Sequence, residues 1–252
     1  MFIKYFEIEV IVLRKFFILF AILGFLPQST IVDYSLQIFY EERIPYAVTN
    51  ETGQVSGLTA SPTANAFQKS NIDFVWKKMP FNRQLQTIKY NKKKACGIGW
   101  FKKPEREEFA IFSEPIYQDM PSITLSKQGN TSVAKHENAE SLLKDKSLKL
   151  LVKDGFSYGR YIDVLIEKHS PARVVAVGSS NLQMLQMILS GRADYFFVSE
   201  EEAEEIITSA GYSLQVFQRQ RYTDMPPGNK RYIACSQRVT DEIVDRLNDV
   251  IE

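Results

Sequence analysis

The sequence is poor in the residues that most often bind metals. Its 252 residues include two cysteines and two histidines. Cys96 and Cys235 lie far from His136 and His169, at none of the spacings that zinc sites use, so we predict no metal site. An even number of cysteines in an exported chain permits one disulfide, and two inert buried thiols are the alternative.

Several motifs of the common enzyme classes are also absent. The chain has no Walker loop, no His-Glu-x-x-His and no dinucleotide fingerprint. This absence does not exclude catalysis, but nothing in the sequence indicates a cofactor, and we expect none.

The chain lacks an excess of charge of either sign. It has 31 basic and 30 acidic residues, with a formal net charge of +1. A nucleic-acid-binding domain usually carries a marked basic surface, so we expect no nucleic-acid partner. The apolar share of 44% and the charged share of 24% are ordinary for globular proteins, and the length suits one large core or two modest ones.

A continuous apolar run lies within the first thirty residues. Arg14 and Lys15 precede apolar residues 16–26, and Pro27 follows. This run fits the roughly 7–15 residues of a secretory signal and is shorter than the roughly 18 needed to cross a bilayer. We therefore assign residues 1–30 to a signal peptide and expect a periplasmic or otherwise exported protein. An uncleaved membrane anchor is the alternative, because no clean small-x-small cleavage site follows.

Segments typical of strands and helices alternate along the rest of the chain. This pattern predicts an α/β fold with mostly parallel sheets flanked by helices. The expected strands are 36–40, 72–76, 95–99, 123–125, 148–152, 173–177, 195–198 and 232–235. The expected helices are 63–70, 83–91, 139–144, 158–169, 181–190, 200–210 and 239–252.

The most informative stretch covers residues 97–117. It begins with a Gly-Ile-Gly strand end, continues through Pro104-Glu105-Arg106, and ends in a Phe-Ser-Glu-Pro run at residues 112–115. This order resembles the signature of the family 3 extracellular solute-binding proteins of amino-acid transporters. Further matches extend the resemblance from about residue 36 to residue 250, namely Pro45-Tyr46, Met79-Pro80-Phe81, residues 153–157 and residues 191–194.

The resemblance implies a two-lobed, type II periplasmic-binding-protein fold. We expect a first lobe over residues 34–118, a second lobe over 119–222 and a return to the first lobe over 223–252. Two strands would join the lobes, with a ligand in the cleft between them. The resemblance also places Cys96 and Cys235 on neighbouring strands of the first lobe, as candidates for a disulfide.

The family's ligand contacts map onto individual residues. Arg106 matches the arginine that holds the ligand carboxylate, and Phe81 matches an apolar wall. Gly99 matches a backbone contact, Tyr40 a first-strand contact, and Ser157 a contact at a helix N-terminus. Without the resemblance, Arg106 would be a surface residue paired with Glu105 or Glu108; with it, the guanidinium suits a two-point bond to a carboxylate.

Aromatic residues and two departures bear on the ligand. Phe101 stands where the family has a threonine, and Ser199, with Glu200 beside it, stands where the family has the aspartate that holds an α-ammonium. We therefore expect an apolar carboxylate, or one without an α-ammonium. Either a cleft wall or ordinary core packing fits the aromatic residues Tyr40, Tyr46, Phe81, Trp100, Phe101, Phe156 and Tyr158.

The resemblance thus implies a monomeric, non-catalytic protein that closes around a small carboxylate and delivers it to a membrane transporter permease or a sensor. One alternative is an enzyme on the same scaffold, of the cyclohexadienyl dehydratase type, with Glu42 or Glu200 as the general acid or base. Another is a ligand-sensing module.

Overall fold

The computed structural model describes residues 35–176 and 180–251. The predicted signal peptide or anchor at residues 1–30 lies outside the described residues, as do residue 177 of one expected strand and residue 252 of the last helix. Within the described ranges, no helix has the length and apolar character needed to cross a membrane.

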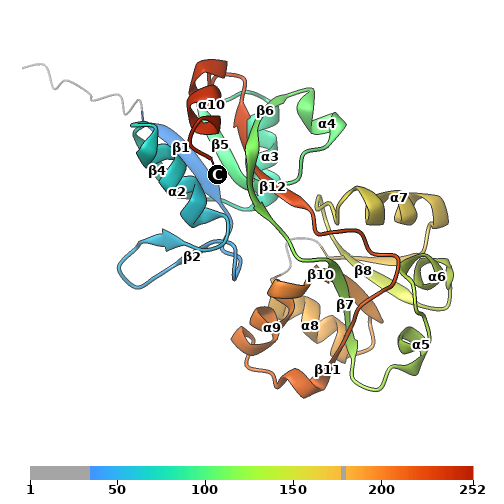
Figure 1. Cartoon of the computed structure of the whole chain (residues 1–252). Helices are drawn as coiled ribbons and strands as arrows, with labels where there is room; N and C mark the ends of the chain where they lie inside the picture. The colour runs from blue at the N-terminus through green and yellow to red at the C-terminus, as the bar shows by residue number, and fades with distance from the viewer. Residues whose placement is uncertain (1–34, 177–179, 252) are drawn as a thin grey trace, which may run out of the picture. The chain divides into compact units, whose positions relative to one another are not determined.

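The first lobe is built on a five-stranded sheet in the order β4-β1-β5-β12-β6 (Figure 1). Four of these strands run in one direction, and in the sheet as described β12 runs against them. The strands are β1 (Leu36–Tyr40), β4 (Phe74–Lys78), β5 (Ala95–Trp100), β6 (Ala110–Gln118) and β12 (Lys230–Ser236). The helices are α2 (Ala60–Lys69), α3 (Phe81–Lys89), α4 (Pro104–Glu107) and α10 (Asp241–Asn248), and a small hairpin pairs β2 (Val48–Thr49) with β3 (Val55–Ser56).

Both faces of this sheet are covered. Ile38 and Tyr40 of β1 belong to one core together with Phe67 of α2, whereas Phe39 belongs to a second core with Ile88 of α3. Successive strand residues point to opposite faces, so a continuous apolar strand needs a helix layer on each side. This requirement explains why the run at β1 is apolar throughout.

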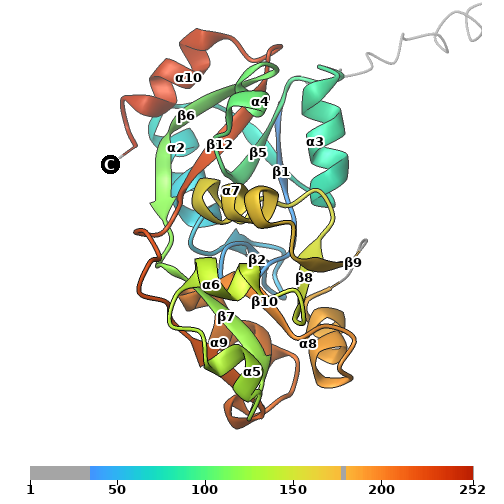
Figure 2. The same ribbon diagram turned by 90° about the vertical axis from the view of Figure 1, so that its right-hand side faces the viewer.

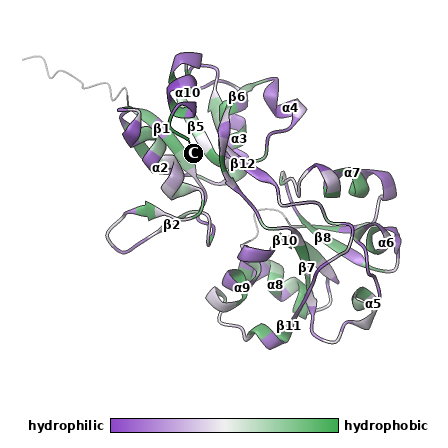
Figure 3. Ribbon diagram, in the orientation of Figure 1, coloured by the Kyte–Doolittle hydropathy of each residue, from purple (hydrophilic) through white to green (hydrophobic). Residues whose placement is uncertain are grey.

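The second lobe repeats the arrangement with the strand order β11-β7-β10-β8-β9. Phe196 of β10 packs in a core with Leu185 of α8, and Phe197 packs on the other face with Ile162 of α7. Figure 3 shows the hydrophobic residues gathered on the strands of both sheets. The elements are β7 (Ser122–Lys127), α5 (Thr131–Ala134), α6 (Ala139–Lys144), β8 (Lys149–Lys153), α7 (Arg160–His169), β9 (Ala172–Ala176), α8 (Asn181–Leu189), β10 (Tyr195–Ser199), α9 (Glu200–Ser209), η1 (Leu214–Val216) and β11 (Phe217–Gln220).

Two segments connect the sheets, one after β6 and one before β12. They run side by side, because the Asp119 amide donates to the Asn229 carbonyl at 2.9 Å and the Gln118 side chain donates to the Gly228 carbonyl at 3.1 Å. The approach is so close that a β-carbon on Gly228 would overlap the Asp119 carbonyl. The second lobe is therefore inserted between two neighbouring strands of the first.

Cys96 of β5 and Cys235 of β12 lie directly opposite each other and form a disulfide, with Cα atoms 3.9 Å apart. Figure 2 shows β12 between β5 and β6. The predicted strand neighbours are thus confirmed, and the described chain contains the bond rather than two free thiols. The predicted two-lobed α/β fold is also confirmed.

Candidate functional site

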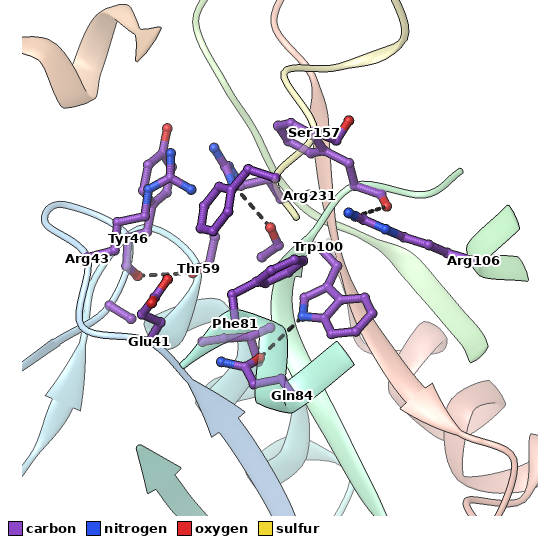
Figure 4. A pocket seen from close by; sticks show the side chains of 15 residues that line it. Glu41, Arg43, Tyr46, Thr59, Phe81, Gln84, Trp100, Arg106, Ser157 and Arg231 are labelled. Atoms are coloured by element: carbon purple, nitrogen blue, oxygen red, sulfur yellow. Dashed lines mark hydrogen bonds between the residues drawn. The ribbon is translucent and has the colours of Figure 1, made fainter. Parts of the chain in front are cut away.

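A pocket lies where β1 and β5 end, which is the edge at which open α/β sheets bind ligands. The cavity has a volume of about 70 Å³, which is room for several waters, since one water needs about 10–15 Å³. Both lobes line it (Figure 4). The lining residues are Glu41, Arg43, Tyr46, Ala47, Thr59, Phe81, Gln84, Ile98, Gly99, Trp100, Phe101, Arg106, Phe156, Ser157 and Arg231.

Aromatic rings form the apolar part of the pocket. Phe81, at the start of α3, packs 5.2 Å from Trp100 and 4.9 Å from Phe156, measured between ring centroids. Phe156 comes from the loop after β8, so these rings join the two lobes. The indole of Trp100 donates to the Gln84 side chain at 3.3 Å, which in turn donates to the Met79 carbonyl at 2.8 Å. Both polar ends of Gln84 are therefore already used.

Arg106 lies on the short helix α4 and is buried, with 7% of its surface exposed. Its guanidinium lies 5.4 Å from the Phe81 ring and 5.5 Å from the Trp100 ring, and donates to the Phe101 carbonyl at 3.0 Å. Within the described ranges it forms no ion pair. Burial lowers the pKa of Arg106, with Glu105 and Asp163 opposing that shift in part, but a guanidinium stays charged in proteins. The pocket therefore holds a charged donor without an acidic partner.

Arg231, at the start of β12, is a second buried arginine of the pocket. It pairs with Asp119 of the crossing segment at 2.5 Å and donates to the Gly99 carbonyl at 3.1 Å. Its guanidinium lies 3.9 Å from the Tyr46 ring centroid and 4.7 Å from that of Phe101. Burial raises the pKa of Asp119, and the charge of Arg231 offsets part of that rise. This arginine is thus committed to a protein partner.

Arg43 is the third arginine, in the loop after β1. It donates through two nitrogens to the two carboxylate oxygens of Glu202, each at 2.6 Å, and Glu202 is 2% exposed. Burial acts to lower the pKa of Arg43, but contact with Glu202 outweighs it and the pKa is raised. Because Glu202 belongs to α9, this ion pair connects the two lobes.

Tyr46 forms another connection between the lobes. Its hydroxyl is hydrogen-bonded to the Ser199 hydroxyl and donates to Glu201 at 3.3 Å. Burial, the largest influence, raises the pKa of Tyr46, which keeps the phenol neutral and available as a donor.

Six of the predicted site residues line the pocket together: Phe81, Gly99, Phe101, Arg106, Phe156 and Ser157. Gly99 has φ = 72°, a conformation that favours glycine. Ser157 lies before α7 rather than at its first residue, and its hydroxyl donates to Asp163 at 2.5 Å. Asp163 also accepts from the Tyr158 amide at 2.8 Å, so part of the expected anion-binding capacity of this helix start is used internally.

The other predicted site residues lie elsewhere. Tyr40 packs in the first-lobe core, 5.7 Å from the Trp76 ring, and bonds to the Thr49 hydroxyl. Ser199 bonds to Tyr46, and Glu200 accepts from Arg221 at 2.9 Å on another part of the surface. Sequence reasoning did not single out the lining residues Glu41, Arg43, Thr59, Gln84 and Arg231 as ligand contacts.

Solved structures of similar fold include binding proteins for amino acids. An ancestral arginine-binding protein bound to arginine matches with a TM-score of 0.67 and 17% identity, over 86% of this chain and 90% of that chain. The arginine-, lysine- and histidine-binding protein of Geobacillus stearothermophilus matches with a TM-score of 0.67 and 14% identity, over 86% and 89%. The substrate-binding protein of an amino-acid ABC transporter gives 0.64 and 15%, over 86% and 91%.

These structural matches define the class of fold. A search of curated proteins found no match. The model of the bacterial extracellular solute-binding proteins, family 3, matches residues 36–246, and the chain belongs to this family.

Proposed function

We propose that this protein is exported, captures a small carboxylate-bearing molecule, an amino acid or a related compound, between its lobes, and delivers it to an ABC-transporter permease as a monomer. Family membership supports solute capture. Proteins with two hinged lobes bind by closing around the ligand. The affinity then depends on how strongly the ligand favours the closed form, and no covalent reaction of the ligand is needed.

The observation that carries the carboxylate is Arg106. A buried guanidinium without an acidic partner is costly unless something else supplies the negative charge. The aromatic rings hold this guanidinium at the pocket, where a carboxylate can accept two parallel hydrogen bonds. A bound carboxylate therefore supplies the acidic partner that Arg106 lacks among the described residues.

The positions of two glutamates support binding rather than catalysis. The carboxylate of Glu42 accepts from the Thr49 amide and pairs with Lys78 at 2.7 Å, and it does not line the pocket. Burial acts to raise the pKa of Glu42, but the contacts with Lys78 and Thr49 lower it overall. Glu200 pairs with Arg221 outside the pocket. Neither glutamate is placed to exchange a proton with a molecule held by Arg106.

A carboxylate panel read by thermal shift tests the proposal. A ligand at a hundred times its dissociation constant should stabilise the protein by about 2.7 kcal/mol. Incubation with prephenate and arogenate, followed by product analysis, tests the enzyme alternative. Release of product from either compound would contradict a purely binding role, and a panel without any stabilising carboxylate would contradict the proposed ligand class.

A further inference from the structure

Three acidic groups in or beside the pocket carry cations of the chain itself, whereas Glu201 accepts from Tyr46 and lines a separate cavity. Glu202 holds Arg43 through two hydrogen bonds of 2.6 Å. Asp119 holds Arg231 at 2.5 Å, and Glu41 lies 3.6 Å from the Lys153 ammonium. Among the described residues, the charged group of the pocket lining that lacks such a partner is a cation, Arg106.

Arg43 separates the pocket from Glu202. Arg43 and Phe156 line both the main pocket and a smaller cavity of about 40 Å³. Glu202 is among the residues that line the smaller cavity, and it does not line the main pocket. The Arg43 guanidinium also lies 4.8 Å from the Tyr46 ring centroid and 5.7 Å from that of Phe156. Arg43 thus fills the position from which a cationic group in the pocket would meet Glu202.

We propose that the ligand is a carboxylate without any ammonium group, and that Arg43 is the residue that determines this specificity by supplying the cation for Glu202. This inference rests on the proposed function, because it assumes that Arg106 binds the carboxylate.

The physical reason is the cost of an unpaired charge. A ligand ammonium would have to leave water and lie beside acids that are already neutralised. Sharing Glu202 would place two cations on one buried carboxylate, and like charges repel strongly where water is excluded. A neutral ligand body meets neither cost and packs against Phe81 and Phe156.

Matched ligand pairs test the inference by calorimetric titration of the full chain. Each pair differs by one ammonium group: phenylalanine and 3-phenylpropionate, leucine and 4-methylpentanoate, and 5-aminopentanoate and pentanoate. We expect the wild-type protein to bind the members without ammonium at least about tenfold more tightly, a difference of about 1.4 kcal/mol.

Two variants alter the Arg43–Glu202 pair in opposite ways. Arg43→Met leaves Glu202 without its cation, and we expect the preference to shift toward the ammonium-bearing members by at least about tenfold. Glu202→Gln keeps the shape and frees the Arg43 charge, so glutarate should gain at least about tenfold over glutaramate, which differs by an amide in place of the second carboxylate. Circular dichroism checks that each variant folds.

Arg221→Met is the matched control. Arg221 binds Glu200 through a similar two-point contact on the surface, outside the pocket that Arg106 lines. Its removal should leave every ligand ratio unchanged.

The outcomes separate this inference from the proposed function. Tighter binding of the ammonium-bearing members to the wild-type protein, or unchanged ratios in both Arg43→Met and Glu202→Gln, would overturn the inference and leave the carboxylate site in place. If no ligand of any pair shows binding that requires Arg106, the proposed function is overturned as well.

Discussion

Arg106 keeps its charge in the pocket through contacts with rings and one carbonyl rather than with an acid. Such contacts orient a guanidinium without neutralising it, and a cation–π contact at a desolvated site such as this one is worth about 2 kcal/mol or more. The side chain is thus oriented for an anion before the anion arrives. Pre-organisation of this kind raises affinity because less conformational freedom is lost on binding.

Arg106→Gln should therefore abolish carboxylate binding while leaving the fold nearly as stable. Losing a charge-assisted pair should cost at least about 1.5–3 kcal/mol of binding free energy. Calorimetric titration measures the loss, and Arg83→Gln, on the exposed face of α3, is the control. A large fall in melting temperature together with unchanged affinity would show that Arg106 is a structural residue.

At the scale of elements, the disulfide ties β12 to β5 across a sequence separation of 139 residues. Replacing both Cys96 and Cys235 with alanine should reduce the free energy of unfolding by about 3–5 kcal/mol, because a long closed loop restricts the unfolded chain. Urea unfolding of the oxidised protein and the double variant measures the difference. Equal midpoints would contradict this expectation.

The pair of helices α6 and α7 carries a pH-dependent contact. Glu140 accepts from Lys168 and Lys144, and from His169 at 3.1 Å, and these contacts lower its pKa to about 2. The stabilisation is therefore complete above the unfolded pKa of about 4.3 and is lost as the pH falls toward about 2. Urea midpoints should differ between the wild-type protein and Glu140→Gln at about pH 6 and should converge only as the pH falls below about 2. A constant separation would contradict the assignment.

The sequence predicted most elements within a few residues, because apolar periodicity follows directly from burial on one or two sheet faces. It missed β6 as a strand, since Glu114 and Pro115 interrupt the apolar pattern. The register between β6 and β12 shifts around Pro115, and a bulge of this kind accommodates a residue without an amide hydrogen. The polar strand β11 was missed for a similar reason: it pairs only with β7 at the edge of its sheet in the described structure.

The pocket was less predictable than the fold. Arg106 and Phe81 lie in motifs that the family shares, whereas Arg231 reaches the pocket because β12 pairs with β5 over more than 130 residues. Pairing between strands so far apart in the sequence leaves no pattern in the residues around Arg231 from which its position in the pocket could be predicted. Arg43 could have been singled out, because it closely follows the carboxyl end of a predicted parallel strand.

At the scale of the whole molecule, Gly228 sets how closely the two crossing segments approach. Gly228→Ala should push them apart, because its new β-carbon would overlap the Asp119 carbonyl. We expect a destabilisation of about 1–3 kcal/mol, as in other overpacked sites. Differential scanning calorimetry should show a lower melting temperature by roughly 2–4 °C for each kcal/mol. An unchanged melting temperature in Gly228→Ala would contradict the hinge contact.

The insertion of the second lobe between β6 and β12 also orders the events by which the chain matures. All strands of the second sheet lie between Ser122 and Gln220, so that sheet is complete before β12 has been synthesised. The first sheet, although it begins earlier, lacks its fourth strand until the last part of the chain emerges. The cysteine that pairs with Cys96 lies on β12, so the Cys96–Cys235 bond can form only after the whole second lobe has been synthesised, and its presence marks the closing of the first sheet by β12.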